Sequence, residues 1–106
     1  MQVPMTEVIA VRRLWWEGEP RREVLVRIGK PTETLGITGE FYCPIQTSGL
    51  GNDEFATAIF GVDGFQAIEL AVRFIGYRLA DINARTGGHL RWLGNELPKE
   101  WAQQEH

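Results

Sequence analysis

The chain has 106 residues, of which 43% are hydrophobic and 24% are charged, and its formal net charge is -3. This length and balance predict one soluble globular domain, and the net negative charge argues against binding to nucleic acid or to an anionic membrane. No apolar run is long enough to span a bilayer and the first residues lack a signal-peptide pattern, so we expect a cytoplasmic protein.

Few residues are suited to catalysis or metal binding. Cys43 is the single cysteine, which excludes an internal disulfide and a multi-cysteine metal site. His89 is the only histidine inside the predicted domain, because His106 ends the sequence. Zinc and similar metals need three or four converging ligands. The sequence therefore predicts no metal site, no cofactor and no catalytic group.

The first half of the chain is typical of strands. Residues 1–6 are expected to form an irregular lead-in, because Pro4 interrupts regular pairing. Two stretches rich in Val, Ile and aromatic residues follow, at 7–16 and 23–29, and a turn of composition EGEP lies between them. Together they predict a hairpin.

The register of this hairpin follows from the position of one charge. We predict that Val11 faces Val26 and that Ile9 faces Ile28. A shift of one residue would place Arg12 in the core, and an uncompensated buried charge is costly.

A second pair of strands is predicted at 41–47 and 54–61. The stretch 30–40 before them has Pro, Gly and Thr without a consistent period and is predicted to be a loop. The intervening SGLGND has the composition of a tight reversal. Pro44 cannot donate a ladder hydrogen bond, so its strand is expected to be an edge strand or to be bulged.

Small residues set the expected register of the second hairpin. Ile45 is predicted to face Ala56 and Cys43 to face Ala58, which would put these side chains under the helix. This arrangement would allow the helix to approach the sheet closely.

A long amphipathic helix is predicted over residues 63–86. Asp63 is a good N-cap, Gln66 completes a capping-box-like pair, and Gly87 supplies a left-handed residue at the end. Gly76 is expected to mark a close contact with the sheet. The helix presents apolar residues at steps of three and four, namely Ile68, Val72, Ile75, Leu79 and Ile82.

These elements predict a single α+β domain over residues 1–106. Its four-stranded antiparallel sheet, made of two hairpins within 7–61, packs on one long C-terminal helix at 63–86. A short C-terminal arm at 89–106 follows and is expected to form a short strand or an irregular segment.

Four motifs carry a family resemblance: EVLVRIGKP, CPIQTSGLG, GVDGFQAIELAVRFIG and RLADINARTGGHLRWLG. The chain resembles a family of small bacterial proteins of unknown function. In that family a VRIGxP strand, a CPY-like strand leading to GLG, a GVDSxQALxLAL helix start and an RWLG-like ending recur in this order. The resemblance covers nearly the whole chain and implies one α+β domain without an assigned activity. Gly64 and Ile45 depart from the family pattern, which affects only fine packing.

The predicted registers leave a group of apolar side chains on the sheet face that the helix does not cover. A contiguous exposed apolar patch usually marks a contact surface. Either the C-terminal arm covers this face, or a second subunit or another protein does. The candidate interface consists of Leu14, Trp16, Leu25, Tyr42, Phe55 and Ile59.

Three hypotheses for function follow. The first is a non-enzymatic protein-interaction module, most simply a homodimer joined through the open sheet face. The second is an inhibitor or immunity-type protein that binds a larger partner through Trp16, Glu17 and Glu19. The third is a small-ligand binder or enzyme with a pocket between helix and sheet near Cys43 and His89. The lack of catalytic groups favours the first hypothesis.

Overall fold

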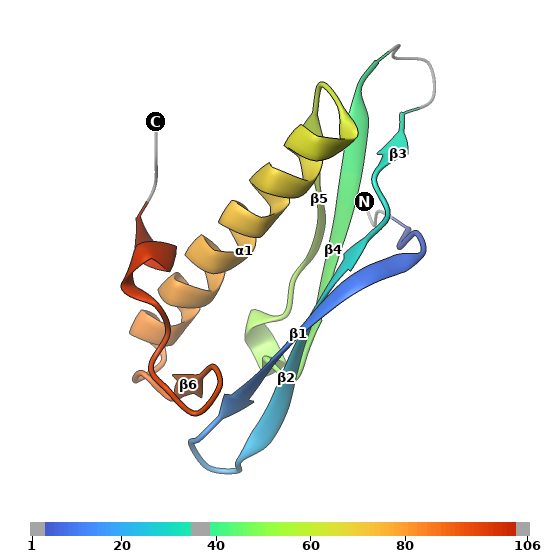
Figure 1. The fold of residues 1–106 in the computed structure, drawn as a ribbon. Helices are drawn as coiled ribbons and strands as arrows, with labels where there is room; N and C mark the ends of the chain where they lie inside the picture. Colours follow the sequence, from blue (N-terminus) through green and yellow to red (C-terminus); the bar gives the residue numbers. More distant parts are fainter. Residues whose placement is uncertain (1–3, 35–38, 104–106) are drawn as a thin grey trace.

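The computed structural model describes residues 4–34 and 39–103, which form an antiparallel sheet with one long helix across one face (Figure 1). Parts of the predicted lead-in, loop and arm (1–3, 35–38 and 104–106) lie outside the described residues. The elements in chain order are β1 (Val8–Trp16), β2 (Arg22–Gly29), β3 (Thr32–Glu33), β4 (Phe41–Ser48), the 3₁₀ turn η1 (Gly51–Asp53), β5 (Ala56–Gly61), α1 (Gly64–Arg85), β6 (Leu90–Arg91) and the 3₁₀ turn η2 (Lys99–Ala102).

The α+β class with an antiparallel sheet and one helix is confirmed, but the described chain has six strands where the sequence predicted four. The two additional strands, β3 and β6, have only two residues each. Such short stretches leave no periodic pattern, because alternation needs at least four residues to be recognised.

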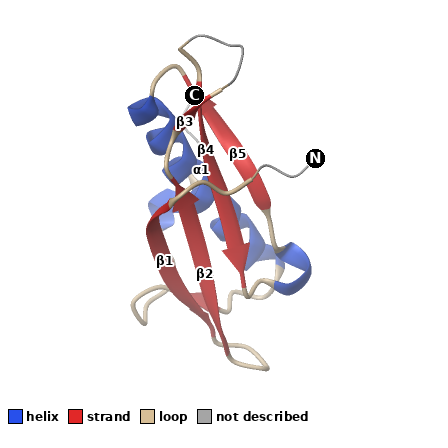
Figure 2. Ribbon diagram, turned by 90° about the vertical axis from the view of Figure 1, so that its right-hand side faces the viewer, coloured by secondary structure: helices blue, strands red, loops and turns tan. Residues whose placement is uncertain are grey.

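The strands form a meander. β4 pairs with β5 along one edge and with β2 and then β3 along the other. β1 pairs with the far side of β2, and β6 pairs with the end of β1. Figure 2 views the sheet from the side opposite α1, so that the helix lies behind the strands.

The register of the first hairpin differs by one residue from the prediction. Arg12 pairs with Val26, and Val11 pairs with Arg27. Leu14 consequently belongs to the helix side of the sheet, where it is fully buried. The shift that the sequence argument rejected is the one that the structure adopts.

Aromatic side chains from the C-terminal arm explain how the sheet tolerates Arg12 on this face. The guanidinium carbon of Arg12 lies 4.5 Å from the ring centre of Trp92 and 5.0 Å from that of Trp101. An aromatic face attracts a cation by about 0.5–2 kcal/mol. The two indole rings thus provide a favourable surface for a charge that the prediction treated as unpaired.

The second hairpin is also shifted by one residue. Ile45 pairs with Thr57 and Cys43 pairs with Ile59, so the predicted pairs with Ala56 and Ala58 are wrong. Cys43 and Ile45 are buried, as predicted. Their partners on β5, Thr57 and Ile59, are larger than the alanines that the sequence argument placed there.

The predicted helix bounds are confirmed to within one residue at each end. The Asp63 side chain accepts a hydrogen bond of 2.8 Å from the Gln66 backbone amide. The Gln66 side chain accepts one of 2.8 Å from the backbone N–H of Val62, one residue earlier than a capping box requires. At the other end, Gly87 adopts φ = 98°, a conformation that glycine reaches without steric cost.

The buried stripe of α1 is rotated relative to the predicted one. Its buried members are Ala67, Ala71, Ile75, Gly76, Leu79 and Ile82. Val72 is 48% exposed and Phe65 is 82% exposed. The small residues Ala67 and Ala71 bring the helix backbone close to β5, and this displaces the bulkier Val72 toward solvent.

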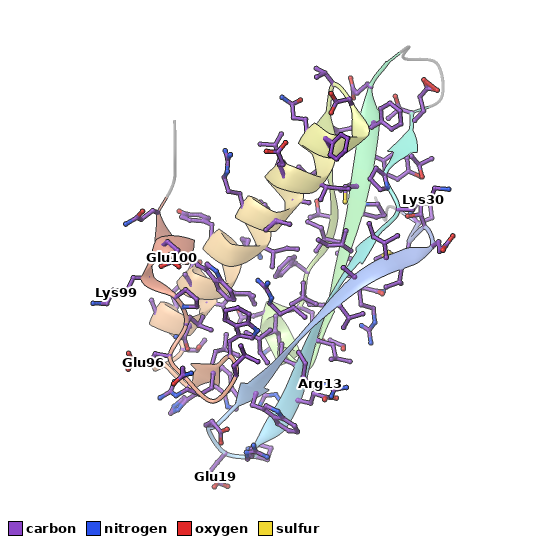
Figure 3. The ribbon with its side chains drawn as sticks, viewed as in Figure 1. Arg13, Glu19, Lys30, Glu96, Lys99 and Glu100 are labelled. Carbon is purple, nitrogen blue, oxygen red and sulfur yellow. The ribbon has the colours of Figure 1, made fainter. Side chains whose placement is uncertain are left out.

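The C-terminal arm packs on the helix side of the sheet. A Cβ atom at Gly76 would lie 3.2 Å from Cγ of Trp101, so the predicted contact of Gly76 with the sheet is wrong and its neighbour is η2. Lys99 of η2 points away from the rest of the molecule (Figure 3). The described part of the arm therefore leaves the opposite sheet face open.

Candidate functional site

The open face of the sheet carries several exposed apolar side chains. Val11 of β1 and Phe60 of β5 are 56% and 52% exposed. The ring centre of Tyr42 lies 6.4 Å from that of Phe60 on the neighbouring strand. Leu25 is only partly buried on the same face. Arg13 points to this side from β1 (Figure 3) and pairs with Glu23.

The six predicted interface residues do not form one surface. Leu14 and Phe55 belong to the buried core, and Trp16 and Ile59 pack against that core. Only Leu25 and Tyr42 remain on the open face, because the shift of both registers moved the other side chains to the helix side. Val11 and Phe60 replace them on the open face for the same reason.

The N-terminal lead-in crosses part of this face, in front of the sheet in Figure 2. The Thr6 hydroxyl donates to the Lys30 carbonyl at 2.8 Å, and the Lys30 amide donates to the Glu7 carbonyl at 2.7 Å. Pro44 is almost fully buried although it lies on this side of β4. The chain therefore covers the part of the face around Pro44 itself.

β5 forms an open edge of the sheet. Within residues 4–34 and 39–103 it pairs with β4 alone, so its outer row of backbone N–H and C=O groups has no strand partner. Its sequence, ATAIFG, has no charge, no proline and no bulge. Natural sheets usually protect an exposed edge with such features, because unpaired edges associate with other strands.

The other edge shows these protective features. β1 carries the charged pair Arg12 and Arg13 and has an irregular register between Val8 and Ala10. β6 pairs with the end of the strand, and the Glu17 amide beyond it donates to the His89 carbonyl at 2.8 Å. The two edges of the sheet are thus chemically different.

An apolar cleft of about 140 Å³ opens between α1 and the first hairpin. The helix crosses the sheet obliquely, so it diverges from β1 there (Figure 1). The residues lining the cleft are Ala10, Val11, Arg12, Val26, Ile28, Val72 and Ile75. Arg12 is the only charged group in this lining.

Arg12 differs from the neighbouring arginines in its partners. Arg13 pairs with Glu23, and the Arg22 side chain donates to the Gly49 carbonyl at 2.7 Å. Arg12 makes no hydrogen bond or ion pair with any residue that the structure describes, and its guanidinium lies next to the indole rings of Trp92 and Trp101. The edge of its guanidinium therefore carries N–H donors without a protein acceptor.

The structure separates Cys43 from His89. Cys43 is buried, and its thiol donates to the Gly29 carbonyl at 3.5 Å. The His89 ring lies 5.3 Å from the ring of Trp16, which pairs with Arg22 at the opposite end of β2. Arg22 and Gly29 are the two ends of the eight-residue strand β2, so seven steps of about 3.3 Å place them about 23 Å apart. The two side chains are therefore too far apart to line one small pocket together.

Two of the three residues of the acidic and aromatic surface predicted around Glu17 and Glu19 make internal contacts, whereas Glu19 is exposed. Glu17 accepts a hydrogen bond of 2.8 Å from Arg21, which lowers the pKa of its carboxyl group. Trp16 packs against the core, with the guanidinium of Arg22 4.7 Å from the centre of its ring. This geometry gives no support to binding of a larger partner through that turn.

The described residues contain neither a metal-binding group nor a helix that could span a membrane. In the described part of the chain, no three His, Cys, Asp or Glu side chains come together in a group able to hold a metal ion. No helix there has both the length and the apolar character needed to cross a membrane.

Comparison with curated proteins gave no match, and comparison with solved structures gave none either. A family model described as "Domain of unknown function (DUF6968)" matches residues 10–100. The match runs from β1 to η2 and so includes both sheet edges, the helix and the cleft. The chain belongs to this DUF6968 family.

Proposed function

We propose that this domain is a non-enzymatic protein-interaction module whose partner is a second copy of the same chain. The contact runs along β5 and extends onto the adjoining open face at Tyr42 and Phe60. The observation that carries the proposal is the uncharged, unpaired edge of β5, which contrasts with the protected edge of β1.

The proposed dimer has a two-fold axis at the middle of β5. Antiparallel pairing about Ala58 would place the two copies of that residue opposite each other, and Phe60 opposite Ala56 of the second copy. The two sheets would become one continuous sheet, and the outer backbone groups of β5 would gain hydrogen bonds. The Tyr42 and Phe60 rings of both copies would then lie on one face.

Ala58→Lys tests this contact. The two lysines would face each other across the axis, and like charges directly opposite destabilise a strand pair. We expect sedimentation velocity at tens of micromolar to give a dimer for the natural chain and a monomer for Ala58→Lys.

Ile9→Lys is the matched control, because Ile9 is an exposed apolar residue on β1 near the other edge. It should leave the dimer intact, and circular dichroism should show that both variants are folded. A natural chain that is monomeric under these conditions would contradict the proposal, as would equal loss of association in both variants.

A further inference from the structure

We propose that the cleft between α1 and the first hairpin binds a small apolar carboxylate. The hydrocarbon part lies against the apolar walls, and the carboxylate binds the N–H groups of Arg12. The site lies between α1 and β1, beside Val11, and does not depend on pairing of β5.

The size of the cleft limits the ligand. Its volume of about 140 Å³ is close to that of apolar protein cavities of about 150 Å³ that accept benzene. It is well below the range of about 300–1,000 Å³ that is typical of sites for drug-sized ligands. A ligand with a chain of about six carbon atoms fits this volume, whereas a folded peptide segment does not.

The walls of the cleft suit a hydrocarbon. Val26, Ile28 and Ile75 form its floor, and all three are buried in the core. Val72 of α1 is half exposed beside them. A chain placed in the cleft would cover part of Val72 and Ala10, and this loss of exposed apolar surface favours binding.

Arg12 provides the charge that complements a carboxylate. Its guanidinium carbon lies 4.5 Å from the ring centre of Trp92 and 5.0 Å from that of Trp101, and the N–H donors of a guanidinium lie in the plane of the group. A carboxylate can accept two parallel hydrogen bonds from this arrangement. Because the described residues offer Arg12 no carboxylate, a ligand would not have to displace one.

Hexanoate is the probe for the first test. Titrated into the full chain, it should shift the amide resonances of Ala10, Arg12 and Val72 saturably and change the fluorescence of the adjacent tryptophans. Hexanol has the same six-carbon hydrocarbon as hexanoate but no charge. Acetate has the carboxylate but only one methyl group. We expect each of them to bind at least about tenfold more weakly, since a charge-assisted hydrogen bond and the burial of several methylene groups each contribute that much.

Variants of Arg12 and Arg13 test which arginine binds the carboxylate of hexanoate. Arg12→Met keeps an unbranched side chain of similar length and should weaken hexanoate binding by about tenfold or more while leaving hexanol binding nearly unchanged. Arg13→Met is the matched control, because Arg13 belongs to the same strand but points to the open face. It should bind hexanoate as the natural chain does.

Val72→Trp provides a test that leaves Arg12 in place. The half-exposed position accepts a larger side chain, and the indole should fill the cleft and abolish hexanoate binding without reducing stability. Three results would overturn the proposal: hexanoate binding no tighter than hexanol, equal binding by Arg12→Met, or resonance shifts away from the cleft. Sedimentation of the same samples reports pairing through β5 separately.

Discussion

Arg12 is the residue whose environment most changed the interpretation of this chain. A charge on the core side of a sheet is costly when it has no compensating contact. In the structure its side chain is half-buried beside the cleft, and its guanidinium packs against Trp92 and Trp101. Long cationic side chains commonly combine apolar packing with an accessible charged end. Arg12 therefore lies at the border of the core and supplies the charge of the proposed site.

The buried thiol of Cys43 predicts how the stability of the protein depends on pH. Burial raises the pKa of its thiol, so the folded protein keeps the proton to a higher pH than the unfolded chain does. The stability that comes from the neutral buried thiol is fully present below the unfolded pKa and is lost as the pH rises through the folded pKa. We expect unfolding free energy to fall on the alkaline side, and Cys43→Ala to reduce this fall while lowering stability at neutral pH.

Thiol titration supplies an independent measurement for Cys43. A buried, protonated thiol should react with a disulfide reagent in the native state only as fast as the protein opens. Fast reaction at neutral pH would show that the thiol is accessible, and an alkaline fall in stability that Cys43→Ala leaves unchanged would show that another group causes the fall.

At the scale of elements, α1 is held from two sides. Its buried stripe packs on β4 and β5, and η2 packs next to Gly76. A glycine in the middle of a helix costs about 1 kcal/mol relative to alanine. Here the missing side chain makes room for Trp101, and Trp101 in turn contacts Arg12. Gly76 thus allows Trp101 to pack against the helix and against Arg12 of the first hairpin at the same time.

Gly76→Leu should destabilise the protein by roughly 1–3 kcal/mol in urea denaturation, because the new side chain would collide with Trp101. A double-mutant cycle with Trp101→Ala identifies the neighbour. We expect Gly76→Leu to cost much less in the Trp101→Ala background. An equal cost in both backgrounds would mean that the helix is crowded by the sheet.

For the whole molecule, the decisive feature is the unequal protection of the sheet. β2 pairs with β1 along its length and with β4 over residues 25–28. β5 pairs on one side only. The helix covers one face of the sheet, while the lead-in crosses the other (Figures 1 and 2). The backbone of β2 is therefore the best protected by hydrogen bonds to neighbouring strands, and the backbone of β5 is the least protected.

Amide hydrogen exchange should be slower in β2 than in β5, in line with this difference in protection. Amides of residues 25–28 are bonded to strands on either side and should exchange slowest, near the rate set by global unfolding. The outward amides of β5 should exchange fast at low protein concentration and slow down as concentration rises, if the chain pairs through this edge. Fast exchange within 25–28, or slow exchange throughout β5 in dilute samples, would contradict this description.

The sequence alone determined the features that depend on neighbouring residues. The helix from Gly64 to Arg85, its Asp63 cap and the α+β class follow from periodicity and capping, which act within a few residues. The two hairpins were also predicted, because turn composition and alternation are local signals.

Only the tertiary structure decided the two registers and therefore the composition of the open face. β1 has apolar residues on both faces, so alternation alone permits either register. The choice depended on Trp92 and Trp101, which are distant in sequence and make the Arg12 side of the strand the inner one. Contacts between distant segments also created the cleft and left the outer edge of β5 without a strand partner among the described residues, and no local pattern encodes such contacts.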